Sequence, residues 1–351
     1  MSAAPVTTGR KHRFHRVAIT GGGGYVGSVL VPELVRCGYE VTVLDWFLYG
    51  EDVLEGVDGQ RLHRVKLDLR DEAAVAAAVQ EMDAVIHLAC ISNDPSFELD
   101  PQLGRSVNYE AFQGLLSAVR AAPTIRRFIY ASSSSVYGIK EESEVCEDMT
   151  CEPLTAYAQY KWRCEEVLRN EGLGDCEWVI LRPATVCGYA PRLRLDLTVN
   201  TLTIHALVNK RITVFGGSQR RPNLNINDMV AVYRLLLEAP ATAIDGQTFN
   251  VGYQNRTVAD LAQLVRREVG DPDVTITMEP SNDLRSYHIN SDWIRQRLGF
   301  SPRGTIEQAV QSLCQAYRAG RIHEPLTNPR YYNIKMMQSV GVGTMAGWSH
   351  A

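Results

Sequence analysis

Residues 16–27 read RVAITGGGGYVG and join a short β-branched run to a glycine-rich loop. Five more short apolar runs follow, with segments of helical spacing between them, at residues 41–45, 63–68, 84–89, 127–131 and 178–182. Such alternation predicts a parallel sheet. The runs are apolar on both sides of the pleat, as expected where helices cover both faces. The sequence therefore predicts an α/β fold with a Rossmann-type, doubly wound parallel sheet.

After Pro183 the pattern changes to irregular sequence rich in Arg and Asn, followed by further helical stretches. A chain of 351 residues, 45% of them hydrophobic, is long enough for two domains. We expect residues 1–185 to form the Rossmann domain, with 226–252 returning to it. Residues 186–325 are expected to form a smaller, interleaved mixed α/β domain for the substrate, and 326–351 a C-terminal tail that packs on a neighbour or on the site.

The composition excludes several classes of function. The net charge of -4 has no basic tract behind it, which argues against nucleic-acid binding. No apolar stretch approaches the roughly 18 residues of a membrane span, and the N-terminus lacks the apolar segment of a signal peptide. The eight cysteines are scattered, without a C-x-x-C pair or suitably spaced histidines. We therefore expect a soluble, cytoplasmic protein with reduced thiols and no metal site.

Three glycines of the loop, Gly21, Gly24 and Gly27, stand at G-x-x-G-x-x-G spacing between the first strand and a helix. Glycine there lets a dinucleotide pyrophosphate approach the backbone and the helix N-terminus. Asp45 ends the second strand, where it would accept hydrogen bonds from the adenosine ribose and repel a 2'-phosphate. The alternative is a tight turn that binds nothing. The combination of a strand, a glycine loop, a helix and an acidic residue favours a dinucleotide-binding site, and Asp45 favours NAD over NADP.

Tyr157 and Lys161 lie four residues apart in a predicted helix and would share one face, toward the nicotinamide cleft. The lysine charge is expected to lower the pKa of Tyr157 from its usual value of about 10, as suits a general base. Ser133 follows the fifth strand, where it could hydrogen-bond the same substrate hydroxyl. Tyr160 lacks the spacing to Lys161, and Asn108 is expected to be structural. An exposed helix pair beside a polar turn is the alternative, but the upstream glycine loop favours a nicotinamide-dependent redox site.

In this order, the glycine loop, Asp45, Ser133 and the Tyr157/Lys161 pair resemble the extended short-chain dehydrogenase/reductase family, specifically its nucleotide-sugar epimerases and dehydratases. The resemblance covers about residues 15 to 320. Further matching segments are DL at 68–69, HLAC at 87–90, SVYG at 135–138, LRP at 181–183, VFGGSQRR at 214–221, ND at 227–228 and FNVG at 249–252. The run APRLRLDL at 190–197 is similar to a subgroup of bacterial enzymes that modify nucleotide sugars for polysaccharides, including 4-dehydrogenases of heptose nucleotides.

The resemblance implies an NAD-dependent enzyme, usually a homodimer, whose substrate is a nucleotide-diphosphate sugar. The implied cofactor-binding residues are Gly21, Gly24, Tyr25, Val26, Gly27, Asp45, Asp68, Leu69, Leu88, Ala89, Tyr157 and Lys161. The implied substrate-binding residues are Ser133, Ser134, Thr185, Asn200, Arg221 and Arg285, with the two arginines on the substrate pyrophosphate. The chain departs from the pattern at Thr185, where many members have a substrate-binding Asn, and at Cys187, where Tyr is common.

Three reactions are compared by the residues that follow Ser133. The 4,6-dehydratases of the family carry an Asp-Glu pair there, because expelling water needs an acid and a base. The decarboxylases usually carry Glu at the second place, and here both places hold serine, Ser134 and Ser135. What remains is a 4-epimerase that works through a transient 4-keto sugar, with a 4-dehydrogenase or ketoreductase that releases the keto product as the alternative. A non-catalytic dinucleotide sensor is a further alternative, although such proteins commonly lose the Tyr/Lys pair.

Overall fold

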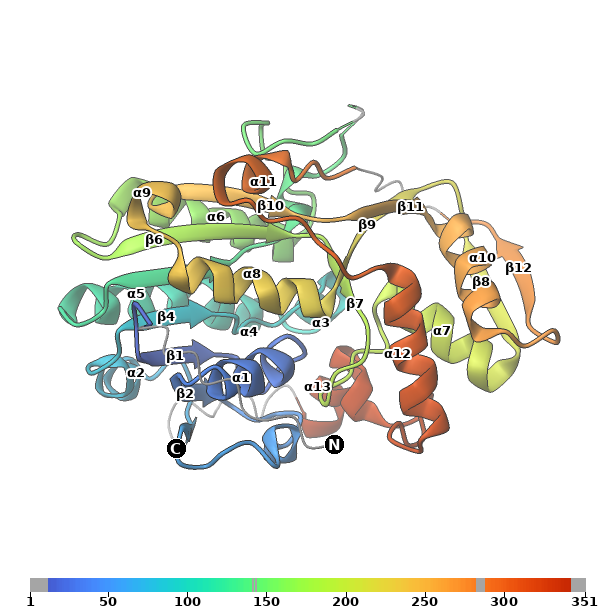
Figure 1. Ribbon diagram of the computed structural model, residues 1–351, viewed down its shortest axis with the longest axis horizontal. Coiled ribbons are helices and arrows are strands. Elements are labelled where there is room, and N and C mark those ends of the chain that lie inside the picture. Colours follow the sequence, from blue (N-terminus) through green and yellow to red (C-terminus); the bar gives the residue numbers. More distant parts are fainter. Residues whose placement is uncertain (1–11, 141, 143, 282–287, 342–351) are drawn as a thin grey trace, which may run out of the picture.

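The computed structural model describes residues 12–140, 142, 144–281 and 288–341. Its large domain is built on a seven-stranded sheet with strand order β10-β6-β5-β4-β1-β2-β3, in which all neighbouring strands run parallel (Figure 1). The strands are β1 (Arg16–Thr20), β2 (Glu40–Asp45), β3 (Leu62–Lys66), β4 (Ala84–His87), β5 (Arg127–Ala131), β6 (Glu177–Pro183) and β10 (Gln247–Val251). The order of the first six is that of a doubly wound sheet, so the predicted fold class is confirmed.

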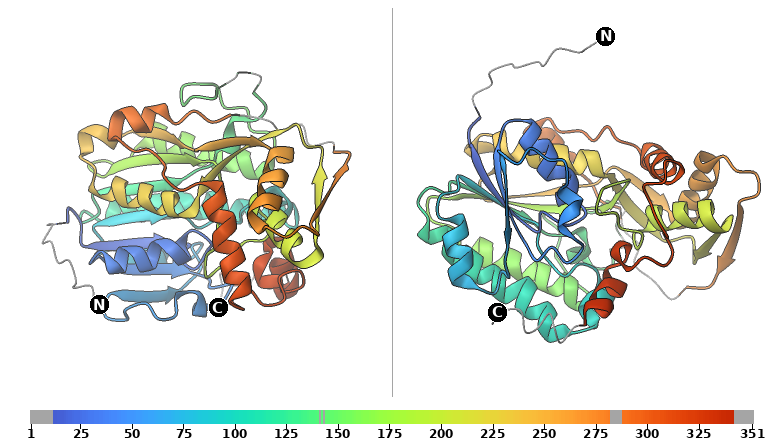
Figure 2. Two further views of the ribbon diagram at one scale, coloured as in Figure 1. Left: turned by 45° about the vertical axis from the view of Figure 1, so that its right-hand side comes forward. Right: turned by 90° about the horizontal axis from the view of Figure 1, so that it is seen from below.

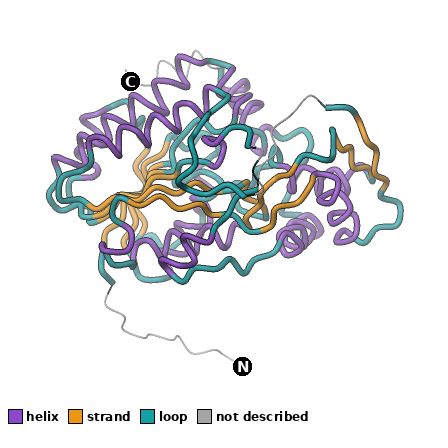
Figure 3. Tube along the Cα trace, turned by 90° about the horizontal axis from the view of Figure 1, so that it is seen from above, coloured by secondary structure: helices purple, strands orange, loops and turns teal. Residues whose placement is uncertain are grey.

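Helices cover both faces of this sheet (Figure 3). One face carries α1 (Gly27–Arg36), α8 (Ile226–Glu238) and the short α9 (Ala241–Ile244), and the other carries α2 (Glu72–Val79), α5 (Ala111–Ala121) and α6 (Ala156–Glu171) (Figure 2). The two faces have separate hydrophobic cores. Along β1, Val17 and Ile19 enter the core under α1, whereas Ala18 enters the other, as the period of two along a strand requires. This double burial is why the strands read as continuous apolar runs.

Short helical turns lie mainly in the connections between these elements. They are η1 (Glu51–Leu54), α3 (Asp94–Glu98), α4 (Pro101–Arg105), η2 (Ser106–Glu110) and η3 (Ser134–Tyr137). The η2 segment is a π-helical turn between α4 and α5 that contains Asn108. The side chain of Asn108 accepts a hydrogen bond from Ile91 N at 2.8 Å and donates one to Ile91 O at 3.0 Å. Asn108 therefore fixes the loop after β4, in the structural role expected for it.

The smaller domain packs three helices, α7 (Thr198–Asn209), α10 (Val258–Val269) and α12 (Ile306–Arg318), against one another and against a parallel strand pair. That pair is β8 (Arg211–Phe215) with β12 (Thr275–Glu279). A second small sheet of β7 (Thr185–Cys187), β9 (Arg220–Asn225) and β11 (Gln254–Thr257) lies where the chain crosses between the domains. The domains interleave: α8 and β10 return to the large domain, and α11 (Asp292–Leu298) also packs there, on β10.

The C-terminal part of the described chain turns back toward the large domain through η4 (Pro329–Tyr331) and α13 (Asn333–Val340). The backbone N–H of Leu195 donates to Tyr331 O at 2.9 Å, and α13 contacts α3. The segment expected to be a tail therefore contains a helix packed between the two domains, next to the cavity described below.

Among the helices that the structure describes, none combines the length and the apolar character needed to cross a bilayer.

His87, at the end of β4, is expected to make the free energy of unfolding depend on pH. The ring is 2% exposed and stacks near Tyr130 and Phe128, and its Nδ1 lies 2.7 Å from Thr20 Oγ1. Burial lowers the pKa of His87 to about 3. Between about pH 6.5 and this value the unfolded chain binds a proton at His87 that the folded chain does not, so the free energy of unfolding falls by about 1.4 kcal/mol per pH unit on acidification.

Urea unfolding measured between pH 7 and pH 5 checks this. We expect His87→Asn, which keeps an acceptor for the Thr20 hydroxyl, to lose stability less steeply with falling pH than the wild type. The matched control is His63→Asn, because His63 lies on the surface with half of its side chain exposed. Equal pH slopes for the wild type and His87→Asn would show that His87 does not carry the effect.

Candidate active site

One cavity of about 480 Å³ runs from the glycine loop past the carboxyl ends of β1, β4 and β5 to the smaller domain. This is the position at which doubly wound sheets bind ligands. Most of the residues predicted from the sequence line it, namely Gly21, Gly24, Tyr25, Val26, Gly27, Asp45, Asp68, Leu69, Leu88, Ala89, Ser133, Ser134, Tyr157, Thr185 and Arg221. The cofactor and substrate residues expected from distant parts of the chain thus share one site.

The glycine loop has the shape of a cradle that side chains would fill. Gly21 has a φ of +74°, and a Cβ there would lie 2.6 Å from the backbone of Ala89. A Cβ on Gly27, the first residue of α1, would lie 2.4 Å from the Gly22 carbonyl oxygen. The absence of these side chains lets the loop pass close to β4 and aim the start of α1 at the cavity. The loop therefore fits a dinucleotide pyrophosphate.

Two carboxylates, Asp45 and Asp68, line the end of the cavity where the sequence predicts the adenosine of the cofactor. Asp45 accepts from Gly23 N at 2.8 Å and from Phe47 N at 2.7 Å, which joins the end of β2 to the glycine loop. Burial raises the pKa of Asp45, while these backbone hydrogen bonds and the Arg192 charge oppose the change. Asp68 is paired with Arg70 through Nε at 3.0 Å to both carboxylate oxygens. The set fits NAD, because Asp45 offers acceptors for ribose hydroxyls and would repel a 2'-phosphate.

Helix α6, which carries Tyr157, is positioned by its cap. The Thr155 hydroxyl accepts from Ala158 N at 3.3 Å, so the helix begins directly before Tyr157 and turns that residue toward the cavity. Tyr157 and Ser133 both line the cavity, and the Ser133 hydroxyl lowers the pKa of Tyr157. Ser133 Oγ also accepts from Ser135 N at 3.1 Å, which caps η3. The phenol and the serine hydroxyl therefore face the same point of the cavity, as the sequence predicts.

Lys161 lies one turn further along α6 and does not line the cavity. Its side chain is 4% exposed, its Nζ donates to Ala131 O at 2.6 Å, and the ammonium lies 5.1 Å from the Tyr130 ring centroid. The prediction that Lys161 lowers the pKa of Tyr157 is wrong in this structure. Burial raises the pKa of Tyr157 and the Asp94 charge adds to the effect, whereas Arg194 and the Ser133 hydroxyl lower it.

The predicted substrate residues divide into three groups. Thr185, at the start of β7, and Arg221, on β9, line the cavity. Asn200 does not: its fully buried amide accepts from Gly188 N at 3.0 Å and donates to Arg194 O at 2.8 Å. It also donates to the Tyr25 hydroxyl at 3.1 Å. Asn200 therefore holds Tyr25, which lines the cavity, without lining the cavity itself. Arg285 lies outside the described residues.

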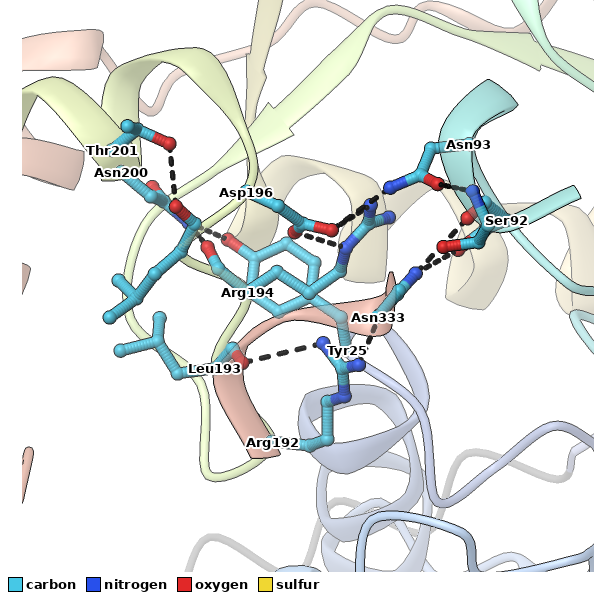
Figure 4. Close-up of polar contacts among 12 residues, drawn as sticks. Tyr25, Ser92, Asn93, Arg192, Leu193, Arg194, Asp196, Asn200, Thr201 and Asn333 are labelled. Carbon is cyan, nitrogen blue, oxygen red and sulfur yellow. Dashed lines mark hydrogen bonds and ion pairs between the residues drawn. The ribbon is translucent and has the colours of Figure 1, made fainter. Parts of the chain in front are cut away.

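Sequence reasoning missed a charged wall that the smaller domain contributes. Arg192, Arg194 and Asp196 line the cavity, while Leu193 and Leu195 between them are buried in the core of the smaller domain. The charge of Arg194 acts on Tyr157, and its Nε donates to Asp196 Oδ1 at 2.9 Å (Figure 4). The sequence feature that could have indicated this wall is the strict alternation of apolar and charged residues in RLRLDL at 192–197, which is typical of an extended segment with one polar face.

A second missed contribution comes from α13. Asn333 and Met337, four residues apart on one helix face, are buried and line the cavity. The Asn333 amide donates to Ser92 O at 3.1 Å and to Ser92 Oγ at 2.7 Å, which attaches α13 to the loop after β4. Asp94, beside that loop, also lines the cavity. No motif in the sequence marks Asn333, since its partner Ser92 lies 241 positions away.

Comparison with known proteins shows which family the chain belongs to. Residues 17–252 match the model of the NAD-dependent epimerase/dehydratase family. The chain belongs to this family. It is 29% identical over 313 residues to a UDP-glucose 4-epimerase of Mycolicibacterium smegmatis, a match that covers 86% of this chain and 98% of that protein. It is 26% identical over 334 residues to UDP-glucuronic acid decarboxylase 1 of Arabidopsis thaliana, which covers 91% of this chain and 73% of that protein.

A solved structure has the same fold. The dTDP-glucose 4,6-dehydratase of Streptomyces venezuelae, solved with NAD bound, superimposes with a TM-score of 0.79 at 24% identity, covering 89% of this chain and all of that one. The family resemblance read from the sequence is therefore confirmed. As a member of the NAD-dependent epimerase/dehydratase family, the protein is an enzyme of the extended short-chain dehydrogenase/reductase class and uses NAD, for which the glycine loop and Asp45 provide a fitting site.

Proposed function

We propose that the protein is an NAD-dependent nucleotide-sugar 4-epimerase. The observation that carries the proposal is the neighbourhood of Ser133: it lines the cavity together with Tyr157, and the next two residues, Ser134 and Ser135, line the same cavity without a carboxyl group. Dehydration and decarboxylation are expected to need acids at these places. Oxidation and reduction at a single sugar carbon need only a base, a hydrogen-bond donor and the cofactor.

The residues at this point of the cavity can perform both halves of an epimerisation. The Tyr157 oxygen removes the proton from the C4 hydroxyl, while Ser133 donates a hydrogen bond to the same sugar oxygen. NAD held by the glycine loop and Asp45 would supply the hydride acceptor at C4 and, once the keto sugar has turned its other face, the hydride donor. Tyr157 then gives the proton back to the C4 oxygen. The base regenerates in each cycle, so no carboxylate is required after Ser133.

The substrate is proposed to be a nucleotide-diphosphate sugar. Arg221 on β9 and Thr185 on β7 line the cavity on the side of the smaller domain. A forked guanidinium such as that of Arg221 suits a substrate pyrophosphate. The same role for Arg285 and the formation of a homodimer stay predictions.

The reaction products decide between this proposal and its alternatives. We would incubate the purified enzyme with UDP-glucose, UDP-glucuronic acid and dTDP-glucose in turn, in deuterated water, and follow each sugar by NMR. A 4-epimerase converts one of these into its C4 epimer, with no deuterium at C4 and no net NADH. A keto product that accumulates only with added NAD would instead support the 4-dehydrogenase. A 4-keto-6-deoxy sugar with deuterium at C5, where a solvent deuteron replaces the proton removed during loss of water, would identify a dehydratase.

A further inference from the structure

Arg192, in the segment that leads into α7, is a buried cation without an anionic partner. The residue is 2% exposed. Its Nη1 donates to Leu193 O at 3.3 Å, its Nη2 donates to Asn333 Oδ1, and its Nε has no hydrogen-bond partner. The guanidinium carbon lies 3.5 Å from the centroid of the Tyr49 ring. Across the described part of the chain, no carboxylate lies within ion-pair distance of Arg192.

Burying a guanidinium in this arrangement costs free energy unless another molecule supplies the missing counter-charge. Arginine stays protonated in proteins, and a buried guanidinium that is held only by neutral acceptors loses hydration without gaining a counter-charge. The neighbouring Arg194 shows the contrast, because it is paired with Asp196 through two hydrogen bonds, at 2.9 Å and 3.1 Å. Arg192 lines the cavity, and its Nε is buried without a hydrogen-bond partner, so an anion bound in the cavity is expected to compensate its charge.

The surroundings of Arg192 belong to the cofactor half of the cavity. Its backbone N–H donates to Ser28 Oγ at 3.2 Å, directly after the glycine loop. Its side chain stacks on Tyr49, four residues beyond Asp45, and its charge acts on Asp45. By contrast, Arg194 is the arginine whose charge acts on Tyr157. Within the cofactor half, the pyrophosphate is the anionic part of NAD.

We propose that Arg192 is a cofactor-binding residue, which the smaller domain places opposite the glycine loop to bind the pyrophosphate of the dinucleotide. The proposal rests on the NAD dependence of the family and not on which sugar reaction follows. The glycine loop provides backbone N–H groups and a helix N-terminus, which attract phosphate but carry no full charge. Arg192 adds the charge and a forked donor set suited to phosphate oxygens.

Asn333 orients this arginine. Its Oδ1 accepts a hydrogen bond from Arg192, while its Nδ2 donates to Ser92 (Figure 4). The same Oδ1 also accepts from the Tyr49 hydroxyl. Arg330, three residues earlier, donates from Nε to Tyr49 O at 2.8 Å. The segment from η4 to α13 therefore joins the loop after β2, the loop after β4 and the Arg192 segment at the cofactor groove. Asn333 is a positioning residue, because it acts on the cofactor through Arg192.

Binding measurements with fragments of the cofactor test the proposal without any turnover. Wild type, Arg192→Met and Arg192→Lys would each be stripped of bound nucleotide and titrated calorimetrically with NAD, ADP-ribose and adenosine. We expect Arg192→Met to bind NAD and ADP-ribose about 10- to 100-fold more weakly, as for loss of a charge-assisted hydrogen bond, and adenosine unchanged. Arg192→Lys should recover part of the loss, since it restores the charge. The exposed Arg234→Met on α8 is the control for removal of a positive charge.

Two results would overturn the proposal. One is unchanged affinity of Arg192→Met for NAD and ADP-ribose. The other is equal weakening for adenosine, which would indicate a general structural role. Asn333→Asp adds a matched test, because it is nearly isosteric and places a carboxylate beside Arg192. We expect it to reduce NAD affinity and the NAD-induced rise in melting temperature, because the new carboxylate pairs with Arg192 and competes with the pyrophosphate. An unchanged NAD-induced rise in this variant would also count against the proposal.

Discussion

Replacing Tyr157 by Phe is expected to reduce kcat by about two to four orders of magnitude, the range for a general acid and base, while NAD stays bound. The substitution removes only the phenol oxygen of a residue that lines the cavity together with Ser133. The ring remains to pack at the start of α6. Turnover with the nucleotide sugar identified by NMR gives kcat, and nucleotide released on denaturation gives the NAD content.

Tyr160 provides the matched control on the same helix. Its ring packs on Phe97 and Tyr109, at centroid distances of 5.5 Å and 5.7 Å, and it does not line the cavity. Tyr160→Phe is therefore expected to keep kcat within a few-fold of the wild type. Near-normal turnover by Tyr157→Phe, or an equal loss in both variants, would remove Tyr157 from the role of base.

The pH dependence follows from the same residue. Burial raises the pKa of Tyr157, so its deprotonated, basic form is the minor one at neutral pH. Wild-type kcat is therefore expected to rise as the pH increases from neutral toward alkaline values. The residual activity of Tyr157→Phe should lack this rise, because the group that titrates has been removed. A pH profile with the same slope in both proteins would assign the titration to another group.

Local patterns explain why much of the fold and the site could be predicted. The strands of the large sheet are buried on both faces, so each appears in the sequence as an apolar run. The glycine loop and Asp45 follow from the fixed geometry of a strand, a turn and a helix. Tyr157 and Ser133 lie at the ends of such elements, where the topology brings them to one edge of the sheet.

The parts that could not be predicted depend on contacts between distant segments. Which way the Lys161 ammonium turns is set by the carbonyl of Ala131 on β5 and not by its spacing from Tyr157. The buried position of Asn200 depends on the path of the loop that follows β7. The contribution of Asn333 depends on Ser92, 241 residues earlier in the sequence. Periodicity describes one element at a time, so it cannot identify such partners.

Replacing Glu165 by Ala is expected to cause the largest loss of stability, about 3–5 kcal/mol, the cost of removing one partner of a buried ion pair. Glu165 is fully buried on α6, two turns beyond Tyr157. Its carboxylate accepts from Arg182 at 2.7 Å and 3.0 Å and from Ser132 at 2.5 Å. Arg182 is 1% exposed, so Ala at position 165 would leave that guanidinium in the core without its carboxylate.

The network also fixes the catalytic groups, which separates this prediction from a simple loss of packing. Glu165 joins α6 to β6 through Arg182 and to the serine run through Ser132, the residue before Ser133. The urea midpoint of Glu165→Ala should therefore fall far below that of Glu166→Ala, whose side chain is exposed at the next position. The kcat per folded molecule should fall as well, because Tyr157 and Ser133 lose their common anchor. Similar midpoints for the two variants would contradict the assigned role.

In the double variant Glu165→Leu with Arg182→Met, removal of both charges is expected to restore much of the stability but not the activity, because the hydrogen bond to Ser132 is still missing.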